Sequence, residues 1–240
     1  MSKNSKSSIR DFYFSFLKLG VSDMERFSNI SMAVVRRLPK YYRYLGEMLK
    51  NDIKRVSSQE LSKITGFTAS QIRQDLNCFG GFGQQGYGYN SEELHREIGK
   101  ILGLDRLYKT VIIGAGNLGH AIANYSNFDK SGFKTQGIFD VSAKIIGQKV
   151  SNVEVMHIDK LERFVMENDI TIGIICTPKA YAQDAADLLV RGGVKGIWNF
   201  APADLKVSDE VIVENVNLIE SLFTVSYLIK ERDEANIKKK

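Results

Sequence analysis

A glycine turn between a strand and a helix constrains this chain more than any other stretch. Residues 110–119 read Thr-Val-Ile-Ile-Gly-Ala-Gly-Asn-Leu-Gly, so three β-branched residues run into the pattern Gly-x-Gly-x-x-Gly. Apolar residues then follow at helical spacing. Gly114 lacks a Cβ and can make the turn, Gly116 lets a pyrophosphate approach the backbone, and Gly119 lets the helix pack close. Free N–H groups at the helix start would face the phosphates. The predicted phosphate-binding residues are Gly114, Ala115, Gly116, Asn117, Leu118 and Gly119.

An acidic residue follows the turn at the spacing that dinucleotide-binding domains use. Asp140 ends a second apolar run, Gly-Ile-Phe-Asp, at roughly the 20-residue distance expected of the ribose-binding acid. A carboxylate accepts a hydrogen bond from a ribose 2′-hydroxyl and repels a 2′-phosphate. We therefore expect NAD(H) to be preferred over NADP(H). The alternative is a glycine turn in an α/β domain that binds no dinucleotide.

Strands and helices alternate through the remainder of the chain, which predicts an α/β fold with a doubly wound parallel sheet, the Rossmann arrangement. The sheet is complete by about Asn215. The expected strands are 111–113, 135–139, 153–155, 170–176, 196–198 and 211–214, and the expected helices lie near 117–125, 160–167 and 181–191.

Basic charge is concentrated in the first part of the chain. The net charge is +5, but residues 1–90 hold 14 Lys+Arg against 7 Asp+Glu, a balance of +7, and the remainder balances at −2. Such asymmetry suggests a polyanionic partner for the first part. A solvated basic surface explains the charge equally well, so charge alone leaves both readings open.

Two capped helices separated by a glycine turn occupy the centre of the basic part. A helix from Leu38 to Lys50 is followed by the capping boxes Ser57-Ser-Gln-Glu and Thr68-Ala-Ser-Gln, which open helices over 58–64 and to about Asn77. This is the helix-turn-helix arrangement. The second helix should bury Ile72, Leu76 and Phe79 and turn its polar residues outward, where such residues reach base edges and phosphates.

The stretch 79–89 alternates glycines with aromatic residues. A flexible linker is the alternative, but the aromatic residues favour an anchored β-hairpin, which after a helix-turn-helix forms a wing. The whole chain thus reads as a leader over 1–30, a winged-helix domain over 31–90, a Rossmann domain over 91–216 and a C-terminal segment over 217–240. In that segment, residues 218–231 form a helix that is apolar on most sides, which favours cover by another subunit over packing on its own domain.

Read together, these stretches resemble the Rex family of redox-sensing transcriptional repressors from about Val35 to Lys230. The resemblance implies a homodimer of winged-helix and Rossmann domains, with the C-terminal helix swapped between subunits for dimerisation. It also implies binding to an inverted-repeat operator in double-stranded DNA, sensing of the NADH/NAD⁺ ratio and release by NADH. The stretches that carry the resemblance are residues 36–45, 70–76, 79–89, 114–119 with Tyr125, 196–202 and 213–216.

The resemblance also assigns roles to individual residues. Tyr125, Thr177, Pro178 and Phe200 would lie at the nicotinamide end of the NAD(H) pocket. An interdomain contact would join Arg43 to the position of Asn217. The residues placed at DNA are Arg37, Lys40, Ser57, Thr68, Ser70, Gln71, Arg73, Gln74, Gly83, Gln84 and Gly86.

The chain departs from the family pattern at four positions. Asn217 replaces the usual aspartate partner of the arginine, and its amide lacks the charge that strengthens such a hydrogen bond. Leu218 replaces a phenylalanine and Cys78 a tyrosine. Gln85 replaces an arginine in the wing, which would remove a DNA contact.

Two other functions compete with this reading. An NAD-dependent dehydrogenase needs a substrate domain and an acid/base beside the nicotinamide, yet nothing large follows the sheet. His95 lies on the connecting helix, His120 lies inside the phosphate-binding helix, and His157 precedes a helix and has no evident carboxylate partner. A CoA-binding module is the second rival, against which Asp140 argues.

The spacing of the two cysteines indicates the cellular compartment and excludes one kind of metal site. Cys78 and Cys176 lie far apart without a CxxC motif, which fits the cytoplasm and excludes a zinc module built on cysteine. No apolar run reaches membrane-spanning length, so no membrane partner is expected.

Overall fold

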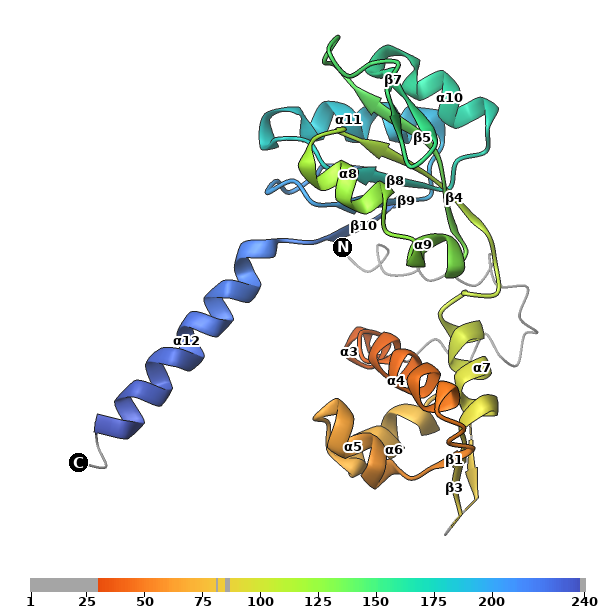
Figure 1. Cartoon of the computed structure of the whole chain (residues 1–240), viewed down its shortest axis with the longest axis vertical. Coiled ribbons are helices and arrows are strands. Elements are labelled where there is room, and N and C mark those ends of the chain that lie inside the picture. Colours follow the sequence, from red (N-terminus) through yellow and green to blue (C-terminus); the bar gives the residue numbers. More distant parts are fainter. Residues whose placement is uncertain (1–29, 81, 85–86, 238–240) are drawn as a thin grey trace, which may run out of the picture. The chain divides into compact units, whose positions relative to one another are not determined.

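The chain divides into two compact units after Arg106 (Figure 1). The structure is a computed structural model that describes residues 30–80, 82–84 and 87–237. Helix α7 (Ser91–Ile101) lies in the first unit, where Leu94 and Ile98 are fully buried in the core. The boundary between units therefore falls after residue 106 instead of after residue 90, because the apolar face of α7 completes the first core.

The first unit combines helices with a small antiparallel sheet of order β1-β3-β2. Its helices and strands are α3 (Met32–Val35), α4 (Leu38–Lys50), β1 (Arg55–Val56), α5 (Ser58–Thr65), α6 (Ala69–Asn77), β2 (Gly83–Gln84), β3 (Gly88–Asn90) and α7. The predicted helix-turn-helix is α5 and α6, and the predicted hairpin is β2 and β3. The short helix α3 was not expected from the sequence.

Helix starts in this unit follow the local hydrogen-bonding rules. Ser57 Oγ accepts the backbone N–H of Glu60 at 3.1 Å, and the Glu60 carboxylate accepts the backbone N–H of Ser57 at 2.7 Å. The backbone N–H and the hydroxyl of Ser57 both donate to the Glu60 carboxylate, and these two hydrogen bonds lower the pKa of Glu60. Thr68 Oγ1 accepts the N–H of Gln71 at 3.1 Å and caps α6. Ile72 and Leu76 are buried as predicted, each worth about 1.5–3 kcal/mol of apolar transfer.

The second unit is built on a seven-stranded sheet of order β10-β9-β8-β4-β5-β7-β6. All neighbouring strands run parallel except β6 and β7, which are antiparallel. The predicted doubly wound sheet is confirmed, and its strand order reverses between β4 and β8. The strands are β4 (Tyr108–Ile113), β5 (Phe133–Asp140), β6 (Lys149–Val150), β7 (Val153–His157), β8 (Ile172–Ile175), β9 (Gly196–Asn199) and β10 (Ile212–Asn215).

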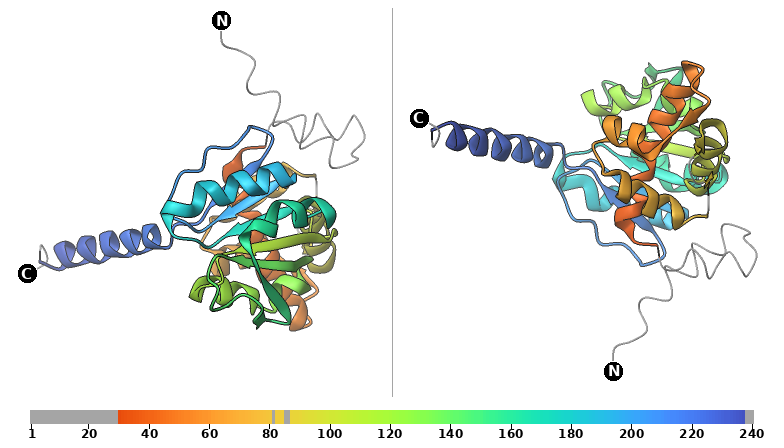
Figure 2. Two further views of the ribbon diagram at one scale, coloured as in Figure 1. Left: turned by 90° about the horizontal axis from the view of Figure 1, so that it is seen from above. Right: turned by 90° about the horizontal axis from the view of Figure 1, so that it is seen from below.

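Helices cover the sheet on both faces, and the strand residues alternate between them (Figure 2). Val111 and Ile113 of β4 pack in one cluster with residues of α10 and α11, whereas Ile112 packs in the other with Ile122 of α8. This alternation is the period of a strand buried on both faces. The helices of this unit are α8 (Asn117–Ala123), α9 (Asn127–Lys130), η1 (Ile158–Lys160), α10 (Leu161–Glu167), α11 (Lys179–Gly192) and α12 (Leu218–Ile237).

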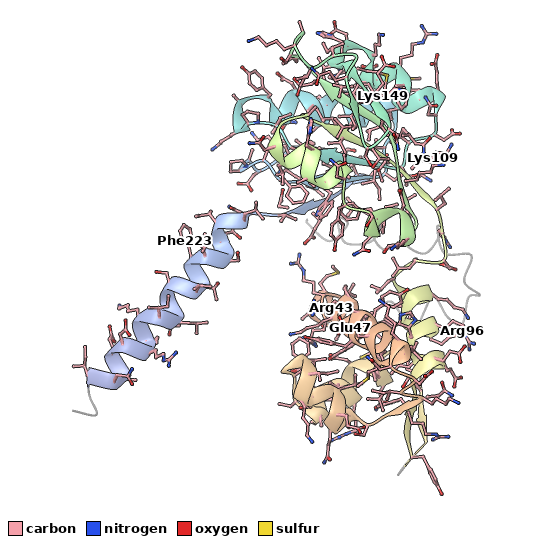
Figure 3. The ribbon with its side chains drawn as sticks, viewed as in Figure 1. Arg43, Glu47, Arg96, Lys109, Lys149 and Phe223 are labelled. Carbon is pink, nitrogen blue, oxygen red and sulfur yellow. The ribbon has the colours of Figure 1, made fainter. Side chains whose placement is uncertain are left out.

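Helix α12 is exposed along its whole length, and none of its residues is even half-buried. Phe223, labelled in Figure 3, is 63% exposed. The other large apolar side chains of this helix are exposed to a similar degree: Leu218, Ile219, Leu222, Val225, Tyr227, Leu228, Ile229 and Ile237. A helix with this composition needs cover. Within the described residues, no helix is long and apolar enough to cross a membrane.

Candidate functional site

The predicted nucleotide-binding residues meet at the carboxyl edge of the parallel sheet. The strands end level with one another: Ile113 of β4 pairs with Phe139 of β5 and with Ile175 of β8, and Ile175 pairs with Asn199 of β9. The glycine turn, Asp140, Thr177 and Phe200 directly follow or end these strands. Because strand order reverses between β4 and β8, this edge holds the crevice in which doubly wound folds bind ligands.

The glycine turn has the geometry that the sequence predicts. Gly114 adopts φ +96°, and a Cβ there would lie 2.7 Å from the carbonyl oxygen of Cys176. A Cβ at Gly119 would overlap the carbonyl oxygen of Gly114. Around Gly116 no atom of the described chain lies within 4 Å of such a Cβ. Two of the three glycines are thus required by the fold itself, whereas the third leaves its backbone open to a ligand.

Asp140 braces this turn with both carboxylate oxygens. Its Oδ2 accepts the backbone N–H of Ala115 at 2.8 Å, and its Oδ1 accepts the N–H of Ser142 at 2.8 Å. A carboxylate has about four acceptor sites, so two remain for ribose hydroxyls. The predicted ribose acid therefore also fixes the loop that is predicted to bind the phosphates, a role that the sequence did not indicate.

The other side of the crevice begins directly after β8. Thr177 Oγ1 is buried and has no hydrogen-bond partner among the described residues. An unsatisfied buried hydroxyl costs about 1–3 kcal/mol, so this atom suits a polar group of a ligand. Burial raises the pKa of the neighbouring Cys176 thiol to about 12, which keeps the thiol protonated and unreactive at neutral pH.

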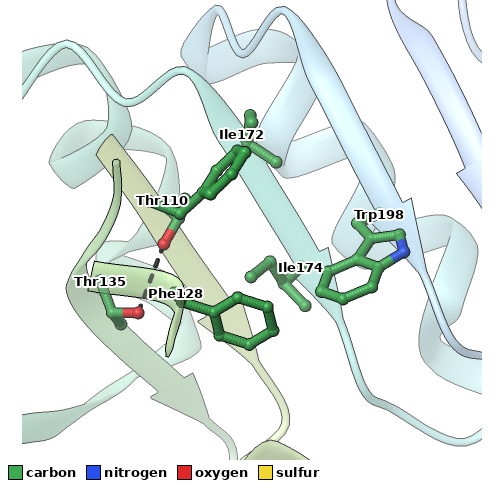
Figure 4. Close-up of a pocket in the computed structure, with 7 residues that line it drawn as sticks. Thr110, Phe128, Thr135, Ile172, Ile174 and Trp198 are labelled. Carbon is green, nitrogen blue, oxygen red and sulfur yellow. Dashed lines mark hydrogen bonds between the residues drawn. The ribbon is translucent and has the colours of Figure 1, made fainter. Parts of the chain in front are cut away.

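Aromatic rings connect the expected nicotinamide end to a cavity on the sheet (Figure 4). Tyr125 contacts Phe128, Phe128 contacts Trp198 and Trp198 contacts Phe200, with ring centroids 5.0, 5.7 and 4.5 Å apart. The cavity, of about 240 Å³, contains none of the predicted cofactor residues. Its lining is Thr110, Phe128, Phe133, Thr135, Ile172, Ile174 and Trp198.

The histidine nearest this edge has a partner that the sequence reading missed. His157 Nδ1 lies 3.0 Å from Asp159 Oδ2, with which a protonated ring pairs, and a neutral ring accepts the backbone N–H of Asp159 at 3.3 Å instead. The expectation that His157 lacks a carboxylate was therefore wrong. The His157 ring caps the start of η1, and the side chains of His157 and Asp159 are both well exposed. The two residues therefore close a turn at the surface.

The outward face of α6 carries the predicted DNA-contact residues. Ser70, Arg73 and Gln74 are exposed, and Gln71 is half-buried. Arg73 Nη1 donates to Ser58 Oγ of α5 at 2.9 Å. This contact holds the long arginine side chain in a defined direction on the exposed face, and no sequence pattern singled out Ser58.

Several other predicted contacts have structural partners. The hydroxyls of Ser57 and Thr68 are engaged in helix caps, and Lys40 Nζ lies 5.0 Å from the ring centroid of Phe67. The guanidinium of Arg37 binds Asp75. Gly83 and Gln84 form β2, whereas Gly86, the substituted Gln85 and residues 1–29 lie outside the described residues.

An arginine beside the wing was missed. Arg55 Nη1 donates to the carbonyl oxygen of Tyr87 at 3.2 Å, and its guanidinium carbon lies 6.0 Å from the Tyr87 ring centroid. Tyr87 is 71% exposed at the hairpin. The adjacent basic residues Lys54 and Arg55, directly before the first capping box, were the available sequence signal.

The two residues of the predicted interdomain contact each have local partners. The Arg43 guanidinium carbon lies 4.6 Å from the Tyr44 ring centroid on the exposed side of α4 (Figure 3). Asn217 Oδ1 accepts the N–H of Ile219 at 3.2 Å, and its amide donates to Glu220 at 3.0 Å. Asn217 therefore caps α12, and its pairing with Arg43 stays a prediction.

Comparison with family models matches the two halves of the chain separately. Residues 105–203 match the model described as "CoA binding domain", and residues 29–77 match the one described as "Putative DNA-binding protein N-terminus".

Curated relatives and solved structures match most of the chain. The redox-sensing transcriptional repressor Rex of Thermoanaerobacter pseudethanolicus is 62% identical over 210 residues, 88% of this chain and 94% of the relative. That of Clostridioides difficile is 64% identical over 203 residues, 85% of this chain and 97% of the relative. The crystal structure of RSP in complex with β-NAD⁺ and operator DNA is 62% identical with a TM-score of 0.81, covering 88% of this chain and 97% of that one. RSP in complex with β-NADH is 59% identical with a TM-score of 0.81, covering 88% and 99%.

Proposed function

The chain belongs to the Rex family of redox-sensing transcriptional repressors, and from this we propose how its two units divide the work. The first unit binds an inverted-repeat operator, and the second binds NAD(H). NADH releases the repressor from DNA, so transcription responds to the NADH/NAD⁺ ratio. The observation that carries the proposal is the open backbone at Gly116 within a braced glycine turn, in a chain that also presents a capped recognition helix.

The dinucleotide lies along the carboxyl edge of the sheet in this proposal. The N–H groups of residues 114–119 bind the pyrophosphate at the start of α8. Asp140 accepts from the adenosine ribose while holding the turn. Thr177, Pro178, Phe200 and Tyr125 surround the nicotinamide, where the buried Thr177 hydroxyl has no partner within the described chain.

Operator binding uses the polar face of α6 with support from α4 and the wing. Arg73, directed by Ser58, reaches base edges in the major groove together with Ser70, Gln71 and Gln74. The wing, including Gly83, Gln84 and Gly86, lies along the phosphate backbone. Lys40 and the capping residues Ser57 and Thr68 lie at the rim of this surface.

Release by NADH requires that NADH and NAD⁺ bind two states of a dimer with different relative affinity, since a ligand shifts an equilibrium only by its differential affinity. We place the dimer interface at α12, whose apolar side chains are exposed in the single chain. Arg43 and Asn217 join the units of opposite subunits. As a repressor acting on operator DNA, the protein works in the cytoplasm.

The test is an operator-binding titration by fluorescence anisotropy, using the operator duplex found in the RSP complex. We expect tight binding with NAD⁺ and release by NADH but not by CoA. CoA is included because residues 105–203 match the model described as "CoA binding domain", and release by CoA at lower concentration than NADH would reassign the second unit.

A matched pair of variants locates the DNA contact. Arg73→Ala should weaken operator binding by about 1–3 kcal/mol, the usual worth of a bidentate base contact, and leave NADH binding intact. Arg163→Ala, an exposed arginine on α10 paired with Glu167, should leave both unchanged. Wild-type operator affinity in Arg73→Ala would refute the assignment of α6.

A further inference from the structure

A buried carboxylate on the recognition helix is held by Tyr41 of α4 and by Arg37, the residue directly before that helix. Asp75 is only 2% exposed. Its two oxygens accept from Nε and Nη2 of Arg37 at 2.6 and 2.7 Å, and Tyr41 Oη donates to Oδ2 at 2.7 Å. Arg37 is the N-cap residue of α4 and Tyr41 lies four residues later in its first turns, so three donors from one end of α4 bind the carboxylate.

The three donors fix how α6 lies on α4. A buried charge without its partners is costly, so the helices must keep the separation and rotation at which all three hydrogen bonds form. Arg37 binds with both prongs of its planar fork, which fixes direction as well as distance. Its side chain is 18% exposed, compared with 3% for the Asp75 carboxylate.

The pKa shifts of Arg37 and Tyr41 agree with this geometry. The hydrogen bond to Asp75 raises the pKa of Arg37. Burial, followed by the hydrogen bond to Asp75, raises the pKa of Tyr41. The guanidinium stays charged and the phenol stays protonated, so all three donors are present throughout the physiological range.

Asp75 lies two residues after Arg73 on the same helix. Arg73 is exposed, whereas Asp75 faces the core. A change in the way α6 sits on α4 therefore moves the residues that read bases. Arg37 was predicted to contact DNA, but two of its five N–H donors and the direction of its fork are committed to Asp75.

We propose that Arg37, together with Tyr41, is a positioning residue that orients the recognition helix through Asp75, and that it does not bind a DNA phosphate. The inference rests on the proposed operator-binding function. It concerns how the reading face is held, and the dinucleotide site in the other unit has no part in it.

Lysine at position 37 separates the two roles. A phosphate contact needs a positive charge at the end of a long side chain, which Lys supplies. The grip on Asp75 needs a bidentate fork, which Lys lacks. A positioning role therefore predicts that Arg37→Lys and Arg37→Ala lose similar affinity, whereas a phosphate contact predicts that Lys rescues Ala.

Salt dependence provides the second readout. Each phosphate contact contributes about −0.9 to the slope of log affinity against log salt. We expect both variants of Arg37 to weaken operator binding by about tenfold, within the range of a lost base contact, while the slope stays that of the wild type. Preference for operator over scrambled duplex should fall by a similar factor.

The full-length chain serves for every measurement, and NADH binding by the second unit is the internal control for folding. Tyr41→Phe keeps the ring that packs edge-on against Phe67 and removes a single donor, so it tests the network should either Arg37 variant unfold. It should lower operator affinity by a few-fold with an unchanged slope and normal NADH binding.

Three outcomes would overturn the proposal: wild-type affinity in Arg37→Lys, a slope reduced by about 0.9 in Arg37→Ala, or wild-type affinity in Tyr41→Phe. Failure of the proposed function itself looks different, because then the wild-type chain binds the operator duplex no better than scrambled DNA at any salt concentration.

Discussion

Replacing Gly116 with alanine should weaken NADH binding without disturbing the fold of the glycine turn. Gly116 adopts φ −77° and ψ −169°, a conformation open to any residue. A Cβ there meets no atom of the described chain within 4 Å. We therefore expect Gly116→Ala to fold normally and to gain about 0.4–1 kcal/mol of stability, because alanine restricts the unfolded chain.

NADH binding should respond in the opposite direction. A phosphate oxygen must come within about 2.9 Å of a backbone nitrogen to accept its hydrogen bond, and the new methyl group occupies that approach. Hydrogen bonds to charged groups contribute about 1.5–3 kcal/mol each. Loss of one such bond would weaken NADH binding by about 10- to 150-fold, since 1.4 kcal/mol corresponds to a factor of ten.

The assay pairs urea denaturation with an NADH fluorescence titration on the same preparations. Gly196→Ala is the matched control, because a Cβ at the start of β9 makes only ordinary contacts of 3.7 and 3.9 Å. It should leave both measurements near those of the wild type. Gly119→Ala should instead lower stability, since its Cβ overlaps Gly114. Wild-type NADH affinity in Gly116→Ala would falsify the placement of the pyrophosphate.

Four further predictions address other parts of the molecule. Asp140→Ala should reduce the preference for NADH over NADPH in calorimetry and lower the unfolding temperature, because Ala115 loses its acceptor; equal preference in the wild type would refute the ribose role. Truncation before Leu218 should yield monomers or aggregates in light scattering; a well-folded dimer would assign pairing to another surface. Asn217→Asp should tighten operator binding and raise the NADH concentration needed for release, and Arg43→Ala should cancel this effect; additivity in that double-mutant cycle would exclude their coupling. Burial lowers the pKa of His95, so the unfolded chain binds more protons, and stability should fall as pH drops below about 6.5; His95→Gln should flatten that dependence in denaturant titrations.

Local patterns predicted the parts of the fold that depend on local physics. The glycine turn, the capping residue Ser57 and the buried face at Ile72 and Leu76 follow from chain geometry and side-chain period, and all agree with the structure. The parallel sheet followed from the alternation of strands and helices. These features need only neighbours within about one turn or one strand.

Features that join distant residues could not be predicted in this way. The pairing of Arg37 with Asp75 spans 38 residues, and the contact of Asp140 with Ala115 spans 25. A polar residue on a helix looks the same in sequence whether it reaches solvent or a buried partner. For that reason the sequence did not reveal Asp75 as the partner of Arg37, nor the packing of α7 in the core of the first unit.

The exposed apolar surface of α12 has a consequence for how the protein is made and measured. Two chains must meet before this surface leaves water, so the stability of the folded form includes a term for protein concentration. The unfolding temperature should rise with protein concentration. Newly made chains at low abundance should be the most vulnerable to proteolysis. Repression would then depend on the amount of repressor more steeply than operator occupancy by a preformed dimer requires.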